Sequence, residues 1–429
     1  MSGMWGKVLT TSGARAFNVA ALLVSTAITA RTLGPEGRGV IAASLAWVAL
    51  FTSVGHLSLS PVSVHRGAGG ERHAEAGRIG GTLLAMVAAI ALLGWGVALA
   101  GYLLTDGEWF RGLNPGVLAL AFVQLPLLLW LEAGLSLFLL LDALPVANRA
   151  QVVGGCVSMA ATYLLVTVAG AGVPGAIAAL LLSRLVTVGM GLAAVRRRIS
   201  FSPPSWPLAR ALVGAGVRLH PSALATAMTL QAPVLLLSHL RPAAEAGYYQ
   251  LALQFVLGMQ LLATSVGLVA YTLVAERGPD AAWPRQRVLL GQAVALSAVT
   301  VLAGWVAAPL LVVAVGGPEF MPAVAVLRWM LLAVPGMTFA TVMASQWVGR
   351  GFFGRVAALS LLVSAAGMVA AWLGIRAYGV RGAAAGFVLT YAAGVVMNGI
   401  MALWVQRASR SSAASPPPPP LAPVPSTGS

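Results

Sequence analysis

Charged side chains are scarce in this sequence. Only 9% of its 429 residues are Asp, Glu, Lys or Arg, whereas a soluble domain carries about a quarter. A soluble chain of this length with so few charges would not cover its own surface. Hydrophobic residues make up 59% of the chain and recur in apolar runs of about 20 residues. We therefore expect an all-α polytopic membrane protein.

Cysteine and lysine are almost absent. Cys156 is the only cysteine, so an intramolecular disulfide is excluded. Lys7 is the only lysine, and no Gly-Lys-Ser/Thr phosphate-binding loop occurs, which argues against nucleotide hydrolysis. The five histidines are scattered without metal-ligand spacing. We expect no cofactor, no bound metal and no catalytic residue, and hence a protein that is not an enzyme.

The formal charge of +15 would fit a nucleic-acid partner, but the distribution of the basic residues argues against one. Arginines lie mainly between the apolar runs, which is the positive-inside pattern of membrane proteins. With the N-terminus inside, 17 basic residues fall on the cytoplasmic side and 6 on the outer side. The sequence predicts a multi-pass protein of the bacterial inner membrane with both termini in the cytoplasm.

The chain divides into two halves of six spans each. We expect an N-terminal lobe over residues 1–198, a cytoplasmic linker over 199–210, a C-terminal lobe over 211–405 and a disordered Pro/Ser-rich tail over 406–429. The expected spans are 11–33, 39–60, 79–104, 115–141, 152–169, 175–195, 211–237, 247–275, 288–314, 321–348, 356–375 and 381–405.

A short loop occurs once in each half, between the first two spans. It reads Pro35-Glu36-Gly37 in the first half, and in the second half it runs from Pro242 through Glu245 to Gly247. Two halves with the same topology are related by an axis along the membrane normal. We expect Glu36 and Glu245 to cap or orient the helices that follow them.

Arginines inside the spans are the first candidate site. Arg15 lies a turn or two into span one, and Arg218 lies at a similar depth in span seven. Two interpretations stay open: the long side chains snorkel to the lipid headgroups, or they form a site for an anionic headgroup across the pseudo-axis. Asn18, one turn from Arg15, would share its face as a further substrate ligand.

Three polar residues lie deeper in the spans. Glu132 in span four and Arg184 in span six are close to the midplane, where a charge costs about 2.5–3.5 kcal/mol. They would pair with each other, or Glu132 would bind a coupling ion, H⁺ or Na⁺, while Arg184 binds substrate. Gln124 hydrogen-bonds between helices or contributes to the same substrate site.

Four segments resemble a known family. They are Ala30–Gly39, Glu245–Tyr249, Gly316–Phe320 and Tyr378–Ala384, and in this order and spacing they are similar to the Wzx-like flippases of polysaccharide and O-antigen biosynthesis. These belong to the multidrug/oligosaccharidyl-lipid/polysaccharide (MOP) exporter superfamily. The resemblance implies two six-helix lobes around a central cavity.

By alternating access, such a protein would move a polyprenyl-pyrophosphate-linked oligosaccharide across the membrane. Arg15 and Arg218 would correspond to the family's cationic cavity residues. One departure matters, because relatives often carry an Asp in span seven where this chain has Pro233. A role for that Asp in ion coupling is therefore in doubt here.

We therefore expect a non-enzymatic flippase of lipid-linked oligosaccharide, with membrane lipid as its other partner. Two alternatives stay open. The first is a drug or metabolite exporter on the same fold. The second is a membrane-embedded glycosyltransferase or polymerase, against which the small outer acidic cluster of Asp106 and Glu108 argues.

Overall fold

The structure is helical throughout the part of the chain it describes. This computed structural model describes residues 2–67 and 72–413, and the side chains within 13–67, 73–261 and 263–405; the Pro-rich end of the expected tail lies outside these ranges. The long helices of the first half are α1 (Ser2–Gly55), α2 (Leu59–Gly67), α3 (Arg72–Leu104), α4 (Pro115–Phe122), α5 (Leu125–Leu140), α6 (Leu144–Thr162) and α7 (Gly172–Arg196). Those of the second half are α8 (Trp206–Leu240), α9 (Ala243–Arg277), α10 (Pro279–Gly316), α11 (Pro322–Leu331), α12 (Val334–Gly349), α13 (Phe353–Tyr378) and α14 (Val380–Ala413).

Helix α1 contains two membrane-length arms. Gly34 interrupts it with φ +65°, a left-handed conformation that glycine adopts without a steric penalty, and Pro35 then starts the second arm. Within the described residues, eleven helical segments are long and apolar enough to cross a membrane, and the first of them holds both arms. Counting the arms separately gives the twelve spans that the sequence predicts.

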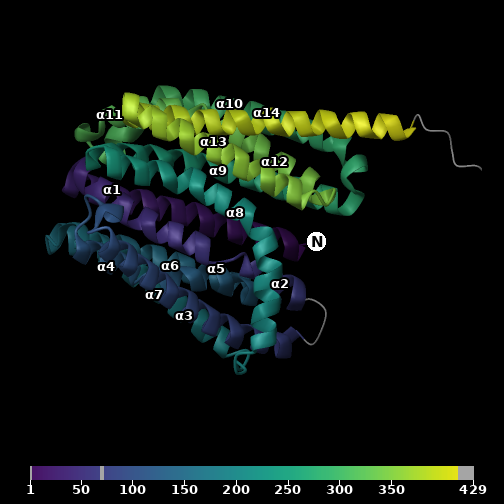
Figure 1. The fold of residues 1–429 in the computed structure, drawn as a ribbon, viewed down its shortest axis with the longest axis horizontal. Coiled ribbons are helices and arrows are strands. Elements are labelled where there is room, and N and C mark those ends of the chain that lie inside the picture. The colour runs from purple at the N-terminus through teal and green to yellow at the C-terminus, as the bar shows by residue number, and fades with distance from the viewer. Residues whose placement is uncertain (1, 68–71, 414–429) are drawn as a thin grey trace, which may run out of the picture.

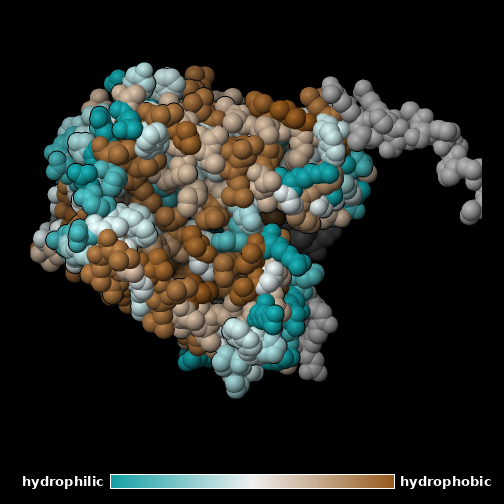
Figure 2. Space-filling view, viewed as in Figure 1, coloured by the Kyte–Doolittle hydropathy of each residue, from teal (hydrophilic) through white to brown (hydrophobic). Residues whose placement is uncertain are grey.

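The helices form two groups that lie one above the other in Figure 1, with α1 between them. We call the end of the bundle that holds the bend at Gly34 the distal end, and the opposite end, where the N-terminus lies, the proximal end. The arginine distribution predicts that the distal end faces outward. Figure 2 shows apolar side chains across the middle of the bundle. Leucines such as Leu93 and Leu310 are exposed on the helices.

Spans four and ten are each broken near their middle. Span four ends as α4 at Phe122 and resumes as α5 at Leu125, with Pro126 in its first turn. Span ten ends as α11 at Leu331 and resumes as α12 at Val334, with Pro335 in the same place. Interrupted helices at corresponding positions of two repeats point to transporter binding sites.

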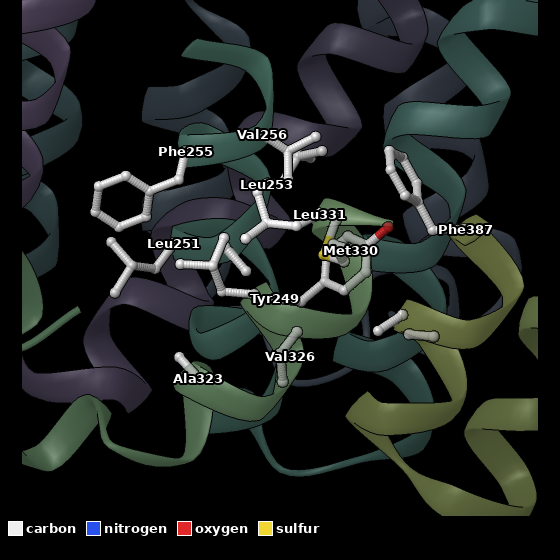
Figure 3. Close-up of a cluster of buried hydrophobic side chains, with 14 of the residues drawn as sticks. Tyr249, Leu251, Leu253, Phe255, Val256, Ala323, Val326, Met330, Leu331 and Phe387 are labelled. Atoms are coloured by element: carbon white, nitrogen blue, oxygen red, sulfur yellow. The ribbon is translucent and has the colours of Figure 1, made fainter. Parts of the chain in front are cut away.

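The larger core belongs to the C-terminal group and extends onto α1. Tyr249, Val256, Val326 and Leu331 are fully buried in it, as Figure 3 shows. Three alanines of α1, Ala30, Ala42 and Ala46, belong to the same buried cluster. The two groups therefore share packed apolar surface along α1.

Glu245 orients a different helix from the one expected. It lies in the first turn of α9, but its carboxylate accepts a hydrogen bond from the backbone N–H of Val380, the first residue of α14 (2.6 Å). The side chain of Arg241 donates to the same carboxylate (3.1 Å). The sequence could not identify α14 as the partner because the contact spans 135 residues.

Candidate functional site: the contact between the two helix groups

Arg15 and Arg218, the two cationic residues expected at the site, lie on α1 and α8, which contact each other. Arg15 is exposed on the first arm of α1, and Arg218 is exposed on α8. Neither forms an ion pair with any carboxylate that the structure describes. Both guanidinium groups are therefore available to an anion.

The depths of the two arginines differ. Arg15 precedes Gly39 by 24 residues, whereas Arg218 precedes Gly247 by 29. Figure 1 shows the first half of α8 crossing the proximal end of the N-terminal group before the helix turns to run beside α9. Pro221 lies in the middle of α8 and removes a helical hydrogen bond there, which accounts for the turn.

The first half of α8 touches the junction between α1 and α2. A Cβ built on Gly216 would overlap the carbonyl oxygen of Leu57, so the two backbones are in direct contact. The Ser58 hydroxyl lies 3.4 Å from Nδ1 of His220, and the rings of His56 and His220 are 5.0 Å apart. This is a contact between the two groups at the proximal end, next to Arg218.

Asn18 forms a hydrogen bond between α1 and α6. Its side-chain amide donates to Oε1 of Gln151 at 3.2 Å, so one of its two N–H donors is used in this contact. Further along α1, the Thr26 hydroxyl donates to Oε1 of Gln254 on α9 at 2.9 Å. Thr26 and Gln254 thus form a buried polar contact across the two groups.

Arg184 binds Gln124 and not Glu132. Its guanidinium donates to Oε1 of Gln124, which is fully buried at the break in span four. The Nε2 of Gln124 has no partner in the described structure. Glu132 is exposed on α5 and forms no ion pair with a described residue. Gln124 lies in the turn between α4 and α5, and its side chain is buried.

A tryptophan of a neighbouring span contacts each broken span. The indole N–H of Trp95 donates to the Phe122 carbonyl, which the break in span four leaves without a helical partner (2.8 Å). In the second half Arg328 donates to the Trp305 carbonyl (3.2 Å) and lies over its ring. The pairs Gly94-Trp95 and Gly304-Trp305 are a further echo of the duplication.

A neutral pocket lies inside the C-terminal group. Its volume is about 180 Å³, and its polar lining includes Thr229, Ser364, Thr390 and Asn398. The hydroxyls of Thr229 and Ser364 are 2.8 Å apart. A smaller pocket that shares three of these residues includes Pro233. No ionised side chain lines either pocket, and no described group of three or more His, Cys, Asp or Glu could hold a metal ion.

Arg38 is a buried cation that the sequence places in a loop. The loop is only a bend at Gly34, so Arg38 falls within the second arm of α1 and is 6% exposed. Its guanidinium donates to the Thr29 hydroxyl (3.1 Å), while its Nε has no partner in the described structure. Spans one and two are separated by only a few residues in the sequence, and this short separation could have indicated that Arg38 lies within a helix.

The comparisons with known proteins identify the fold. No family model matches the chain, and no curated protein sequence does. Among solved structures, the chain is similar to the lipid II flippase MurJ in an inward closed conformation, with a TM-score of 0.76 and 11% identity over 92% of this chain and 87% of that one.

Two MATE transporters are also similar to this chain. One is an inward-facing multidrug resistance transporter of the MOP superfamily, with a TM-score of 0.71 and 16% identity over 93% of this chain and 96% of that one. The other is a MATE transporter from Vibrio cholerae, with a TM-score of 0.59 and 17% identity over 96% of this chain and 98% of that one. At these identities the likeness shows the fold, which is that of MOP-superfamily transporters.

Proposed function

We propose that this protein is a flippase that moves polyprenyl-pyrophosphate-linked oligosaccharide across the bacterial inner membrane for cell-surface polysaccharide synthesis. Its fold is shared with transporters, and one of the structurally similar proteins is named as a lipid flippase. Neighbours named as drug transporters share the fold as well, so the choice of substrate class depends on the chemistry of the site.

The pair of unpaired arginines carries the proposal. Arg15 and Arg218 are exposed on α1 and α8, and Arg218 lies two residues from Gly216 at the proximal contact between the groups. A planar guanidinium donates two parallel hydrogen bonds to phosphate oxygens, so two of them suit a pyrophosphate. With the proximal end in the cytoplasm, they would receive the headgroup from the inner leaflet while the prenyl tail stays in lipid.

Residues deeper in the N-terminal group would serve the next step. Asn18 lies one helical turn from Arg15, and Arg184 with Gln124 supplies donors near the middle of the membrane. Glu132, exposed and without an ion-pair partner among the described residues, is our candidate for a coupling H⁺ or Na⁺. Rocking of the lobes would then expose the headgroup to the outer side.

Export of a small molecule is the second candidate function. The neutral pocket among α8, α12, α13 and α14 favours it, because hydroxyl and amide groups in a cavity of about 180 Å³ suit a compact uncharged ligand. The pocket is small for an oligosaccharide. A small molecule would bind there without any contribution from the arginines.

Ligand-induced thermal stabilisation separates these functions. We would add polyprenyl-pyrophosphate oligosaccharide, the matching polyprenol without phosphate, or a cationic drug to the full-length protein in nanodiscs. The pyrophosphate lipid alone should raise the unfolding temperature, because a ligand that binds only the folded state stabilises it. Arg15→Gln with Arg218→Gln should abolish the shift.

The matched control is Arg285→Gln, which removes an exposed arginine from the proximal end of α10. It should leave the shift unchanged. Equal stabilisation by the drug, or a shift that survives in the double variant, would overturn the flippase proposal. Formation of a glycosidic product by the purified protein would establish a glycosyltransferase instead.

A further inference from the structure

The two copies of the duplicated loop meet each other at the distal end. A Cβ built on Gly39 would overlap the carbonyl oxygen of Ala243, and one built on Gly247 would overlap the carbonyl oxygen of Pro35. The position of the Gly247 Cβ is also 3.1 Å from the amide nitrogen of Gly39. Only glycine permits this approach of one backbone to the other.

The contact is reciprocal. Pro35 precedes Gly39 by four residues, and Ala243 precedes Gly247 by four. Gly39 contacts the residue four positions before Gly247, and Gly247 contacts the residue four positions before Gly39. Interfaces between symmetry-related copies show the same reciprocity. The two halves meet through the same surface. We call this contact, Pro35–Gly39 on Ala243–Gly247, the glycine seam.

Apolar packing and one hydrogen bond continue the seam toward the proximal end. Ala42 and Ala46 of α1 share a buried cluster with Ala246 of α9. The bond from Thr26 to Gln254 follows. These contacts keep α1 against α9 below the glycines.

Farther toward the proximal end, Gly258 of α9 approaches Val19 of α1, whose Cγ1 lies 3.6 Å from the Gly258 Cβ position. From Ala243 to Gly258 is 15 residues, or about 22 Å of helix, against about 30 Å of hydrocarbon. Arg15 lies one helical turn beyond Val19 on the proximal side. The seam therefore separates Arg15 from the distal surface.

We propose that the glycine seam is the outer gate of the transport cycle. It is closed in this structure, and cargo held at the proximal end reaches the outer side only when the two loops separate. Because the closed seam contains backbone contacts that any side chain would obstruct, the paired glycines set the balance between the closed and the open gate. The proposal requires alternating access but does not depend on the identity of the cargo.

The Gly→Ala substitutions separate a gate from a permanent joint. A methyl group at Gly39 or Gly247 has no room in the closed seam, whereas the open state would accommodate it. Alanine at either position should therefore shift the population toward the open gate by about tenfold. The controls are Gly189→Ala on α7 and Gly291→Ala on α10, where a Cβ would meet nothing within 4 Å.

Distances between spin labels report the state of the gate. Glu36 and Pro242 are both exposed, one in each loop, so cysteines at these positions can carry nitroxides after Cys156→Ser removes the only native thiol. Double electron–electron resonance on the full-length protein in nanodiscs should show a short and a longer distance. The longer population should grow in Gly39→Ala and Gly247→Ala and stay at the native level in both controls.

A single short distance that is unchanged in folded Gly39→Ala and Gly247→Ala would overturn the proposal. If the alanine variants do not fold, the distance between the labels is measured in the protein that retains Gly39 and Gly247. The longer distance must then appear in the labelled native-seam protein and change its share when polyprenyl-pyrophosphate oligosaccharide or a cationic drug is added. One fixed distance under all three conditions would identify a permanent joint. A gate that responds only to the drug would retain this proposal and reject the flippase.

Discussion

The distal and proximal ends of the contact between the lobes are built differently. At the distal end, the glycine seam brings backbone against backbone, and Arg31 donates to the Ala314 carbonyl of α10 (2.6 Å). At the proximal end, Gly216 lies against Leu57, and a 3.4 Å contact joins Ser58 and His220. The exposed Arg218 lies between Gly216 and His220, beside the proximal contact.

The two ends differ in how closely the helices of the two groups pack against each other. Small residues let helices pack closely in a membrane, where no hydrophobic force drives them together. The distal end brings small residues and backbone together, whereas at the proximal end Leu208 and Leu212 of α8 are buried in the core of the N-terminal group, beside the Gly216 contact. We infer that the structure represents a state closed at the distal end.

The largest stability effect should follow from the buried hydrogen bond below the seam. Thr26→Val leaves the Gln254 amide oxygen buried without its donor, and we expect a loss of about 2 kcal/mol in the free energy of unfolding. Gln254→Leu should cost about 1 kcal/mol. Thermal or denaturant unfolding in nanodiscs measures both.

The double variant tests whether the two residues act as a pair. Thr26→Val with Gln254→Leu removes both partners. Its loss in the free energy of unfolding should be about 1 kcal/mol smaller than the sum of the two single losses. Strict additivity would show that the bond does not connect the lobes in the protein in solution.

A smaller effect should follow from the cap on α14. Glu245→Ala removes the carboxylate that accepts from the Val380 N–H, and lost caps cost about 1 kcal/mol. Glu245→Gln should retain part of this because its amide oxygen still accepts. Glu36→Ala, in the other copy of the loop, serves as the control and should leave the unfolding temperature unchanged. An equal loss at both positions would contradict the assignment of the cap to Glu245.

The smallest effect should come from the proximal end. Ser58→Ala removes a hydroxyl that lies 3.4 Å from His220, a distance at which a hydrogen bond is weak, so we expect a loss of about 0.5 kcal/mol or less. The same unfolding assay measures it beside Thr26→Val. A loss at Ser58 as large as that at Thr26 would remove the difference between the two ends.

The sequence alone predicted the broad architecture because apolar run lengths and arginine placement are local signals. Twelve spans follow from them once the two arms of α1 are counted separately, although the loop expected between spans one and two is only a bend at Gly34. Pro126 and Pro335 lie in the first turn after the break of each span, whereas Pro309 lies inside the unbroken α10. These features depend on residues close together in the chain.

Partnerships between distant residues could not be predicted in the same way. Glu132 and Arg184 were the obvious pair by charge, yet Arg184 donates to the neutral Gln124, which is buried at the break in span four, while Glu132 is exposed. Similarly, the sequence showed that the loop occurs twice, but not that its two copies touch. Such contacts follow from how the helices pack, which a hydropathy pattern does not encode.

Leaflet accessibility of a fluorescent polyprenyl-pyrophosphate oligosaccharide tests the central claim most directly. In proteoliposomes with the native protein, a membrane-impermeant quencher should reach lipid that began in the opposite leaflet. Arg15→Gln with Arg218→Gln should lower the transfer rate about a hundredfold, since each arginine supplies charge-assisted hydrogen bonds of about 1.5 kcal/mol or more. Arg285→Gln should transfer lipid at the native rate. Transfer at the native rate in the double variant, or none in the native protein, would contradict the account.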